Sequence, residues 1–273
     1  MNLSSEVLAG MEARSGFRAA TLEKVLRLGA VAGEIGVHPF LGPRLVLKGG
    51  TAIQLGLGEP LRLSVDLDYN YIGQLDRDAM LRERPEVEAA LQRVARSGGY
   101  DVAPSGEDHA GRKFHLGYRS HAGSPDRIEV DVNFLMRLPI DAPVERRLWQ
   151  PAEAPPIQIR GVGDAELWAG KIAALLDRTA PRDLFDVAQL PERSQALVAS
   201  PQFRGAVIAW CGILPHPLHT YGRNRLDRVD DAAIEQQLVP MLAGPTRRFR
   251  THPALNWKAL NAREHHARRR PGN

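Results

Sequence analysis

Cysteine and long apolar segments are scarce in this chain of 273 residues. The single cysteine, Cys211, excludes an internal disulfide and is typical of a protein from a reducing cytoplasm. The longest uninterrupted apolar run, from Ala206 to Leu214, is too short to span a bilayer. The first residues, MNLSSEVLAG, lack the basic and apolar segments of a secretory signal. We therefore expect a cytoplasmic protein that makes no use of a membrane.

Motifs of several common enzyme classes are also missing. The chain has no Gly-x-x-x-x-Gly-Lys-Ser/Thr phosphate loop and no Gly-x-Ser-x-Gly hydrolase motif. Its histidine pair, His265 and His266, and His252 have no cysteines or acids at the spacing of metal ligands. These absences argue against P-loop, serine-hydrolase and zinc-site chemistry.

The charge is unevenly distributed along a chain of otherwise ordinary globular composition. The net charge is +4, yet the segment from Thr246 onward holds eight Arg or Lys residues and one acid, Glu264. Basic C-terminal segments often contact nucleic-acid phosphates, and they also occur as solvated ends. Nucleic-acid binding by this tail is one of two open interpretations.

Two aspartates form the strongest chemical signal. Residues 66–72 have the pattern of a strand, so the side chains of Asp66 and Asp68 point to the same face. Neighbouring carboxylates repel each other and are costly to desolvate unless a cation lies between them. Mg²⁺ binds a few carboxylates and completes its coordination with water and substrate phosphates. The pair predicts a Mg²⁺ site, with a solvated strand edge as the alternative.

A glycine pair lies shortly before these acids, with fifteen residues between Gly50 and Asp66. Gly49 and Gly50 precede an apolar segment, Thr51–Leu57, which predicts a turn followed by a helix. The free backbone N–H groups and the positive end of such a helix suit a phosphate. An ordinary turn is the alternative, but glycines and acids in this order together indicate an enzyme that uses nucleotides.

Further along the chain, strands alternate with helices up to about residue 150, and helices predominate afterwards. Strands are expected at Leu45–Leu47, Lys113–Tyr118, Arg127–Leu135 and Ile157–Val162. Helices are expected over the first forty residues, over Asp78–Ser97 with a break at Pro85, from an N-cap at Asp164 to Arg178, and from Pro181. This order predicts an α+β protein with a catalytic core in residues 1–150 and a mainly helical domain with a basic tail in residues 151–273.

The string LVLKGGTAIQLGLGEPLRLSVDLDYNYI, with its Arg-x-Ser-x-Asp-x-Asp block, resembles the AbiEii/MenT family of toxin nucleotidyltransferases in the DNA polymerase β-like superfamily. The likeness covers Leu45 to Leu190. It implies a nucleotidyltransferase-like mixed sheet flanked by helices and a mainly helical C-terminal half. It also implies transfer of an NMP from an NTP to RNA, at a tRNA 3′ end, which blocks translation. A cognate antitoxin is the implied partner.

The resemblance also assigns roles to individual residues. Asp66 and Asp68 would hold two Mg²⁺ ions, and Asp131, in the strand Arg127–Leu135, would be the third acid and help to activate the attacking hydroxyl. A helix lysine, Lys171, placed at the rim of the cleft, would contact the triphosphate. The remaining NTP-binding candidates are Gly49, Gly50, Thr51, Arg62, Ser64, Arg182 and Asp183.

Some roles and functions remain open at this stage. Arg62 would either clamp a phosphate or pair with a carboxylate, and the Asp131 face has the wet side of a sheet as its alternative. Asp183 would act on substrate or brace two helices, and bracing is the expected role of Asp186. The alternative functions are a nucleotidyltransferase that modifies an antibiotic or other small molecule, and a catalytically silent nucleotide- or RNA-binding regulator. The preferred NTP and the RNA are not identified by these residues.

Overall fold

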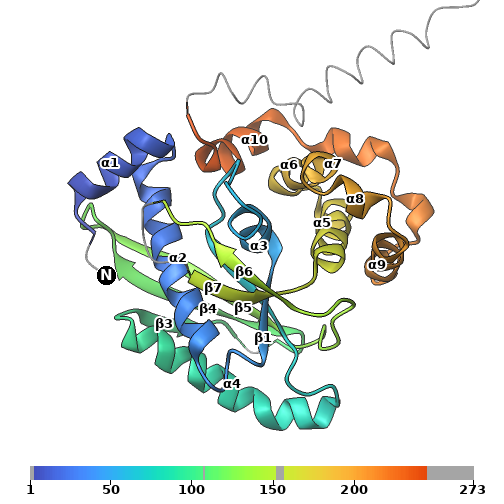
Figure 1. Ribbon diagram of the computed structural model, residues 1–273, viewed down its shortest axis with the longest axis horizontal. Coiled ribbons are helices and arrows are strands. Elements are labelled where there is room, and N and C mark those ends of the chain that lie inside the picture. The colour runs from blue at the N-terminus through green and yellow to red at the C-terminus, as the bar shows by residue number, and fades with distance from the viewer. Residues whose placement is uncertain (1–2, 107, 152–156, 245–273) are drawn as a thin grey trace, which may run out of the picture.

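A seven-stranded mixed sheet forms the centre of the molecule (Figure 1). The computed structural model describes residues 3–106, 108–151 and 157–244. The strand order across the sheet is β3-β4-β5-β2-β1-β7-β6. In chain order the strands are β1 (Leu45–Lys48), β2 (Asp66–Tyr71), β3 (Asp101–Pro104), β4 (Gly111–Arg119), β5 (Pro125–Asn133), β6 (Val144–Leu148) and β7 (Ile157–Gly161).

Two parallel pairings sit among antiparallel ones. β2 runs parallel to β5, and β1 runs parallel to β7, whereas the other neighbouring strands are antiparallel. The strand that begins at Asp66 therefore lies beside the strand that carries Asp131, near the middle of the sheet. Strands interspersed with helices in one mixed sheet confirm the predicted α+β class.

The helices lie against the sheet and beyond one of its ends (Figure 1). The three longest helices of the N-terminal half are α1 (Ser5–Ser15), α2 (Ala19–Val37) and α4 (Arg77–Ser97). The others are α3 (Gly49–Gln54), α5 (Asp164–Arg178), α6 (Pro181–Ala188), α7 (Leu190–Arg193), α8 (Gln195–Val198), α9 (Pro201–Cys211) and α10 (Asp231–Gln237). Short 3₁₀ turns occur at η1 (Leu218–Thr220), η2 (Arg223–Arg228) and η3 (Val239–Met241).

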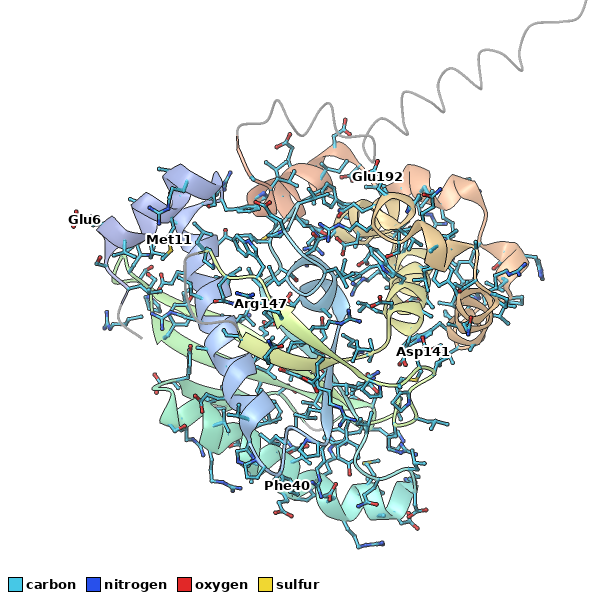
Figure 2. The ribbon with its side chains drawn as sticks, in the orientation of Figure 1. Glu6, Met11, Phe40, Asp141, Arg147 and Glu192 are labelled. Carbon is cyan, nitrogen blue, oxygen red and sulfur yellow. The ribbon has the colours of Figure 1, made fainter. Side chains whose placement is uncertain are left out.

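Alternation along the strands separates a buried face from a polar one. Phe114 and Leu116 of β4 and Val130 and Val132 of β5 are buried, in a core to which α2 also contributes its apolar side chains. Side chains fill the space between the sheet and the surrounding helices (Figure 2). The opposite side of β5 carries polar residues, among them Asp131, that are only partly buried. Packing on one face thus leaves the other free for chemistry.

Several predicted boundaries are wrong. Helix α4 continues through Pro85, because its buried residues pack against the rest of the fold and offset one missing hydrogen bond. Gly163, not Asp164, is the N-cap of α5, and Asp164 instead binds Arg146. The helix expected at Thr51–Leu57 begins earlier, at Gly49, and ends at Gln54. Strands β3 and β6 were not predicted, since partly exposed edge strands lack a clear apolar alternation.

The predicted division at residue 150 falls between β6 and β7, which pair with each other. The sheet thus extends to Gly161, and the mainly helical part begins at Asp164. The division into two domains stays a prediction. Among the described residues, no helix has the length and apolar character needed to cross a membrane. The basic tail from Thr246 lies outside the described residues.

Candidate active site

A cleft of about 570 Å³ separates the polar side of the central strands from α5, α6 and the end of α9. Thr51 is the predicted site residue that does not line it. The cleft is lined by the others: Gly49, Gly50, Arg62, Ser64, Asp66, Asp68, Asp131, Lys171, Arg182 and Asp183. Folding therefore brings together segments that are more than a hundred residues apart in the sequence.

The carboxylates occupy neighbouring positions on two parallel strands. Asp68 on β2 is the register partner of Asp131 on β5, and Asp66 lies two residues before Asp68 on the same strand. Burial, and after it the charge of Asp68, raises the pKa of Asp66 and the pKa of Asp131 above the ordinary value. Asp68 thus lies close enough to Asp66 and Asp131 to disfavour the ionisation of both.

Cations lie near these acids without neutralising them. Lys48 on β1 is the register partner of Asp68, and Lys113 on β4 is the register partner of Asp131. Lys113, however, is bonded to Glu129, with 2.9 Å between Nζ and Oε2. Within the described ranges, neither Asp68 nor Asp131 has a cationic nitrogen within 4.0 Å, and Asp66 has Arg182 Nη1 at 3.8 Å. The sheet side of the cleft therefore carries uncompensated negative charge.

Two glycines leave space for side chains of the cleft. Gly49 has a φ of 74°, which favours glycine, and a side chain there would collide with the Asp68 carboxylate. A Cβ on Gly50 would lie 2.8 Å from Arg62 Nη2 and 2.9 Å from Ser64 Oγ. Because Gly49, Gly50 and Thr51 form the first turn of α3, their backbone N–H groups have no partner within the helix. The Thr51 hydroxyl donates to the backbone carbonyl of Asp66 and so fixes the start of β2.

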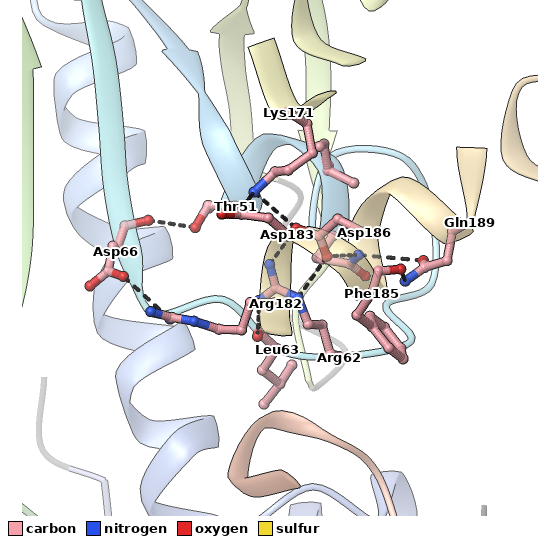
Figure 3. A network of polar contacts seen from close by, with 12 residues as sticks. Thr51, Arg62, Leu63, Asp66, Lys171, Arg182, Asp183, Phe185, Asp186 and Gln189 are labelled. Carbon is pink, nitrogen blue, oxygen red and sulfur yellow. Dashed lines mark hydrogen bonds and ion pairs between the residues drawn. The ribbon is translucent and has the colours of Figure 1, made fainter. Parts of the chain in front are cut away.

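The helical side of the cleft rests on a buried network of ion pairs (Figure 3). Lys171 Nζ lies 2.8 Å from Asp183 Oδ1 and 3.0 Å from Asp186 Oδ2. Arg62 donates to both oxygens of Asp186, at 2.7 Å from Nε and 2.6 Å from Nη2. Gln54 Nε2 donates to the same carboxylate at 2.9 Å. The network joins α3, α5, α6 and the segment that leads to β2.

This network corrects the predicted placement of Lys171 and decides between the two interpretations of Arg62. Lys171 is buried rather than at the cleft rim, and both of its partners come from α6. Arg62 pairs with a carboxylate and is not a free phosphate clamp. Burial alone would raise the pKa of Asp186, but Arg62 and Lys171 hold it below its ordinary value. Asp186 thus links three segments, as expected of a bracing residue.

Arg178, in the last turn of α5, was missed by sequence reasoning although it lines the cleft. Its Nε lies 2.6 Å from Asp183 Oδ2, and 63% of its side chain is exposed. Against the effect of burial, Arg178 and Lys171 lower the pKa of Asp183 to about 2. Arg178 follows Lys171 by seven residues, which places both on one helix face, and this spacing was the available signal.

The acids have the chemistry of a magnesium site that a substrate would complete. Hard carboxylate oxygens without cationic partners suit Mg²⁺, which often takes one or two carboxylates and completes its shell with water and phosphates. No three or more His, Cys, Asp or Glu side chains in the described part of the chain form a group that could hold a metal. The residues present fit a site that a substrate phosphate completes.

Comparisons with known proteins agree with this geometry. A family model described as "Nucleotidyl transferase AbiEii toxin, Type IV TA system" matches residues 35–264, which include both sides of the cleft. The fold is similar to that of MenT4, nucleotidyltransferase toxin Rv2826c from Mycobacterium tuberculosis H37Rv, with a TM-score of 0.59. The two chains are 19% identical, and the match covers 77% of this chain and 70% of the other. No curated protein matches the sequence.

Proposed function

This chain belongs to the AbiEii family of nucleotidyltransferase toxins of toxin–antitoxin systems, and we propose that it transfers an NMP from an NTP to an RNA hydroxyl. The acceptor in this proposal is a tRNA 3′ end in the cytoplasm, and its modification blocks translation. The acceptor hydroxyl loses its proton and its oxygen forms a bond to the α-phosphorus. The bond between that phosphorus and the oxygen that links it to the β-phosphorus breaks, and pyrophosphate leaves. A cognate antitoxin would restrain the enzyme.

The observation that carries this proposal is the group of three acids on β2 and β5, of which only Asp66 has a cationic nitrogen within 4.0 Å among the described residues. Asp66, Asp68 and Asp131 would hold two Mg²⁺ ions together with the substrate phosphates, since no protein cation neutralises Asp68 or Asp131 within the described ranges. When bound, Mg²⁺ stabilises phosphate charge and makes a hydroxyl more acidic. Asp131, on the strand beside β2, would also orient the acceptor hydroxyl towards the α-phosphate.

The opposite side of the cleft would bind the triphosphate. An ammonium group has three N–H donors, and Lys171 uses two of them on Asp183 and Asp186, which leaves one for a phosphate oxygen. Arg182 and the half-exposed Arg178 add two guanidinium groups. Such preorganised donors stabilise the charge that develops on departing pyrophosphate.

The other NTP contacts in this proposal come from the glycine turn and its neighbours. The backbone N–H groups of Gly49, Gly50 and Thr51 would donate to phosphate oxygens. Ser64 is buried beside Gly50 and lines the cleft, so its hydroxyl would do the same. Asp183 would act indirectly, because it holds Lys171 and Arg178 in place. Contact between RNA and the basic tail stays a prediction.

A labelling experiment tests the acceptor class. The purified chain is incubated with Mg²⁺, each labelled NTP in turn and either total RNA or a mixture of small hydroxyl compounds. Labelling of RNA by the parent chain but not by the Asp68→Asn variant supports the proposal. Sequencing of the labelled RNA then shows which RNA is modified and whether the added nucleotide is at its 3′ end. Label on a small molecule would instead show a modifying enzyme, and no label on either would indicate a silent binding protein.

A further inference from the structure

The cleft has an apolar end that the chemistry above does not use. Its lining includes four apolar residues at the end of α9 and just after it, here called the apolar wall: Trp210, Ile213, Leu214 and Pro215. Helix α9 packs along α5, the helix that carries Lys171 and Arg178 (Figure 1). An apolar surface therefore continues directly from the cationic part of the same cleft.

Trp210 owes its position to small residues on α5. A Cβ on Gly170 would lie 3.6–3.7 Å from three adjacent atoms of the Trp210 ring system, so a face of the indole covers this glycine. The Nε1 atom of Trp210 is buried and has no hydrogen-bond partner within the described residues. The indole is thus held beside the cleft by its packing against α5.

The rest of the wall remains open to solvent in spite of its apolar character. The side chain of Ile213 is 61% exposed, although it lines a cleft whose other walls carry charged groups. Phosphates and metal ions make no favourable contact with such an apolar surface. A nucleobase does, because its flat faces bind aromatic and aliphatic side chains whatever its hydrogen-bonding edge.

We propose that the apolar wall binds the nucleobase of the incoming NTP while Lys171 and Arg178 bind its triphosphate. This inference rests on the proposed nucleotidyl transfer. Gly170, beneath the indole, and Arg178 are eight residues apart on one helix, which is about 12 Å along the axis. That span suits an extended nucleoside triphosphate with its base on Trp210 and its γ-phosphate near Arg178.

The donor nucleotide, rather than the acceptor RNA, fits this position. In phosphoryl transfer the attacking oxygen and the leaving group lie roughly in line on opposite sides of the phosphorus. The cations that would hold the leaving pyrophosphate are on α5, against which Trp210 packs. A single ligand can therefore span the wall and the cations, and the acceptor approaches from the other side.

The test compares two kinds of ligand that both carry phosphates: nucleotides, which have a base, and a polyphosphate, which has none. Binding of the four non-hydrolysable NTP analogues and of inorganic tripolyphosphate is measured by calorimetry in the presence of Mg²⁺, without RNA. Trp210→Ala and Ile213→Ala are compared with the parent chain. Ile208→Ala is the matched control, because Ile208 is also on α9, is 67% exposed and does not line the cleft.

We expect Trp210→Ala to bind the nucleotide analogues about tenfold more weakly, as for loss of one stacking contact. Tripolyphosphate binding should not change, which also shows that the variant is folded. Ile213→Ala should shift in the same direction by a smaller factor, and Ile208→Ala should match the parent for both ligands. Ile213→Ala keeps the test valid if Trp210→Ala fails to fold, since an exposed side chain contributes little to stability.

Other outcomes overturn the inference in distinguishable ways. If the parent chain binds nucleotides and both wall variants bind them equally well, the wall is not the base site, whereas the proposed function survives. A transfer assay with RNA as the varied substrate makes the next distinction: if the variants raise only the KM for RNA, the wall contacts the acceptor instead, and the inference is wrong. If the parent binds none of the four analogues, the proposed function fails together with this inference.

Discussion

Both sides of the cleft carry charged groups, but the two sides differ in whether the acids have cationic partners. On the sheet side, Asp68 and Asp131 have no cationic partner within ion-pair distance among the described residues, and 41% of the Asp66 side chain is exposed. On the helical side, Asp186 is fully buried and is bonded to Arg62 and Lys171. One side holds charge that a ligand can relieve, and the other holds charge that is already compensated.

This difference assigns different tasks to residues of the same chemical type. Removal of one member of a buried, paired network leaves its partner charged and desolvated, so the fold is destabilised. Removal of one of several mutually repelling acids relieves repulsion, so the fold should keep its stability while ligand binding is lost. Aspartates of the two sides should therefore separate cleanly when stability and activity are measured together.

The largest effect is expected for Asp186→Ala. This change removes a carboxylate partner from the buried Arg62 guanidinium and from the buried Lys171 ammonium. Breaking a buried pair in this way lowers the free energy of unfolding by about 3–5 kcal/mol. Urea unfolding followed by circular dichroism measures it, with Asp68→Ala as the matched control. Equal midpoints for parent and Asp186→Ala would show that the network does not brace the fold.

Next in size is the loss of transfer in Asp68→Ala. Because the carboxylate repels Asp66 and Asp131, its removal should leave the unfolding free energy unchanged or slightly higher. Transfer should fall by about 10²–10³-fold, the usual result of removing a preorganised electrostatic contact. Asp66→Ala should behave alike, and Asp78→Ala, an exposed acid on α4, should retain parent activity. Near-parent turnover in both cleft variants would contradict the assignment of the acids.

Lys171→Ala should combine the two behaviours. Transition-state stabilisation should fall by about 2–4 kcal/mol if the lysine binds the leaving phosphates. Stability should fall less than in Asp186→Ala, because Asp183 is still paired with Arg178 and Asp186 is still paired with Arg62. Single-turnover rates and urea midpoints of the same preparations measure both quantities. Parent-like turnover together with lower stability would make Lys171 purely a bracing residue.

A smaller effect concerns the acid limb of the stability curve. The folded-state pKa of Asp183, about 2, lies below the ordinary value of 3.8, so its stabilisation is complete above about pH 4 and is lost as the pH falls towards 2. The contribution at neutral pH is about 2 kcal/mol. The difference in unfolding free energy between the parent and Asp183→Asn should therefore shrink from pH 5 to pH 2.5. If this difference in unfolding free energy stays constant over that pH range, groups other than Asp183 cause the loss of stability in acid.

The smallest effect is expected at Arg178, the exposed member of the network. Its pair with Asp183 should contribute less than about 1 kcal/mol to stability, since solvent screens it. Loss of its contact with a phosphate should weaken NTP binding by about tenfold. Arg178→Ala is compared with Arg127→Ala, a similarly exposed arginine on β5 that does not line the cleft. Equal NTP affinity in both variants would remove Arg178 from the site.

Local patterns predicted much of the fold, and the resemblance to the AbiEii/MenT family supplied most of the predicted cleft residues. The period of two in residues 127–135 separates the buried Val130 from the half-buried Asp131, and the structure has the same separation. Helices α5 and α6 also occur where their apolar spacing and the proline at position 181 predicted them. Continuity through Pro85 was not predictable, because it depends on contacts that α4 makes with distant segments.

The ion pairs on the helical side could not be predicted from the sequence. The period of a strand placed Asp66 and Asp68 on one face, and the resemblance to the AbiEii/MenT family pointed to Asp131 and Lys171. Arg62 and Asp186 are 124 residues apart, and no local period relates them. Their pairing depends on how α6 docks beside α3 and the segment before β2. Strand period and family resemblance together thus pointed to the cleft residues, and long-range packing distinguished those that are free to bind a ligand from those that are already paired.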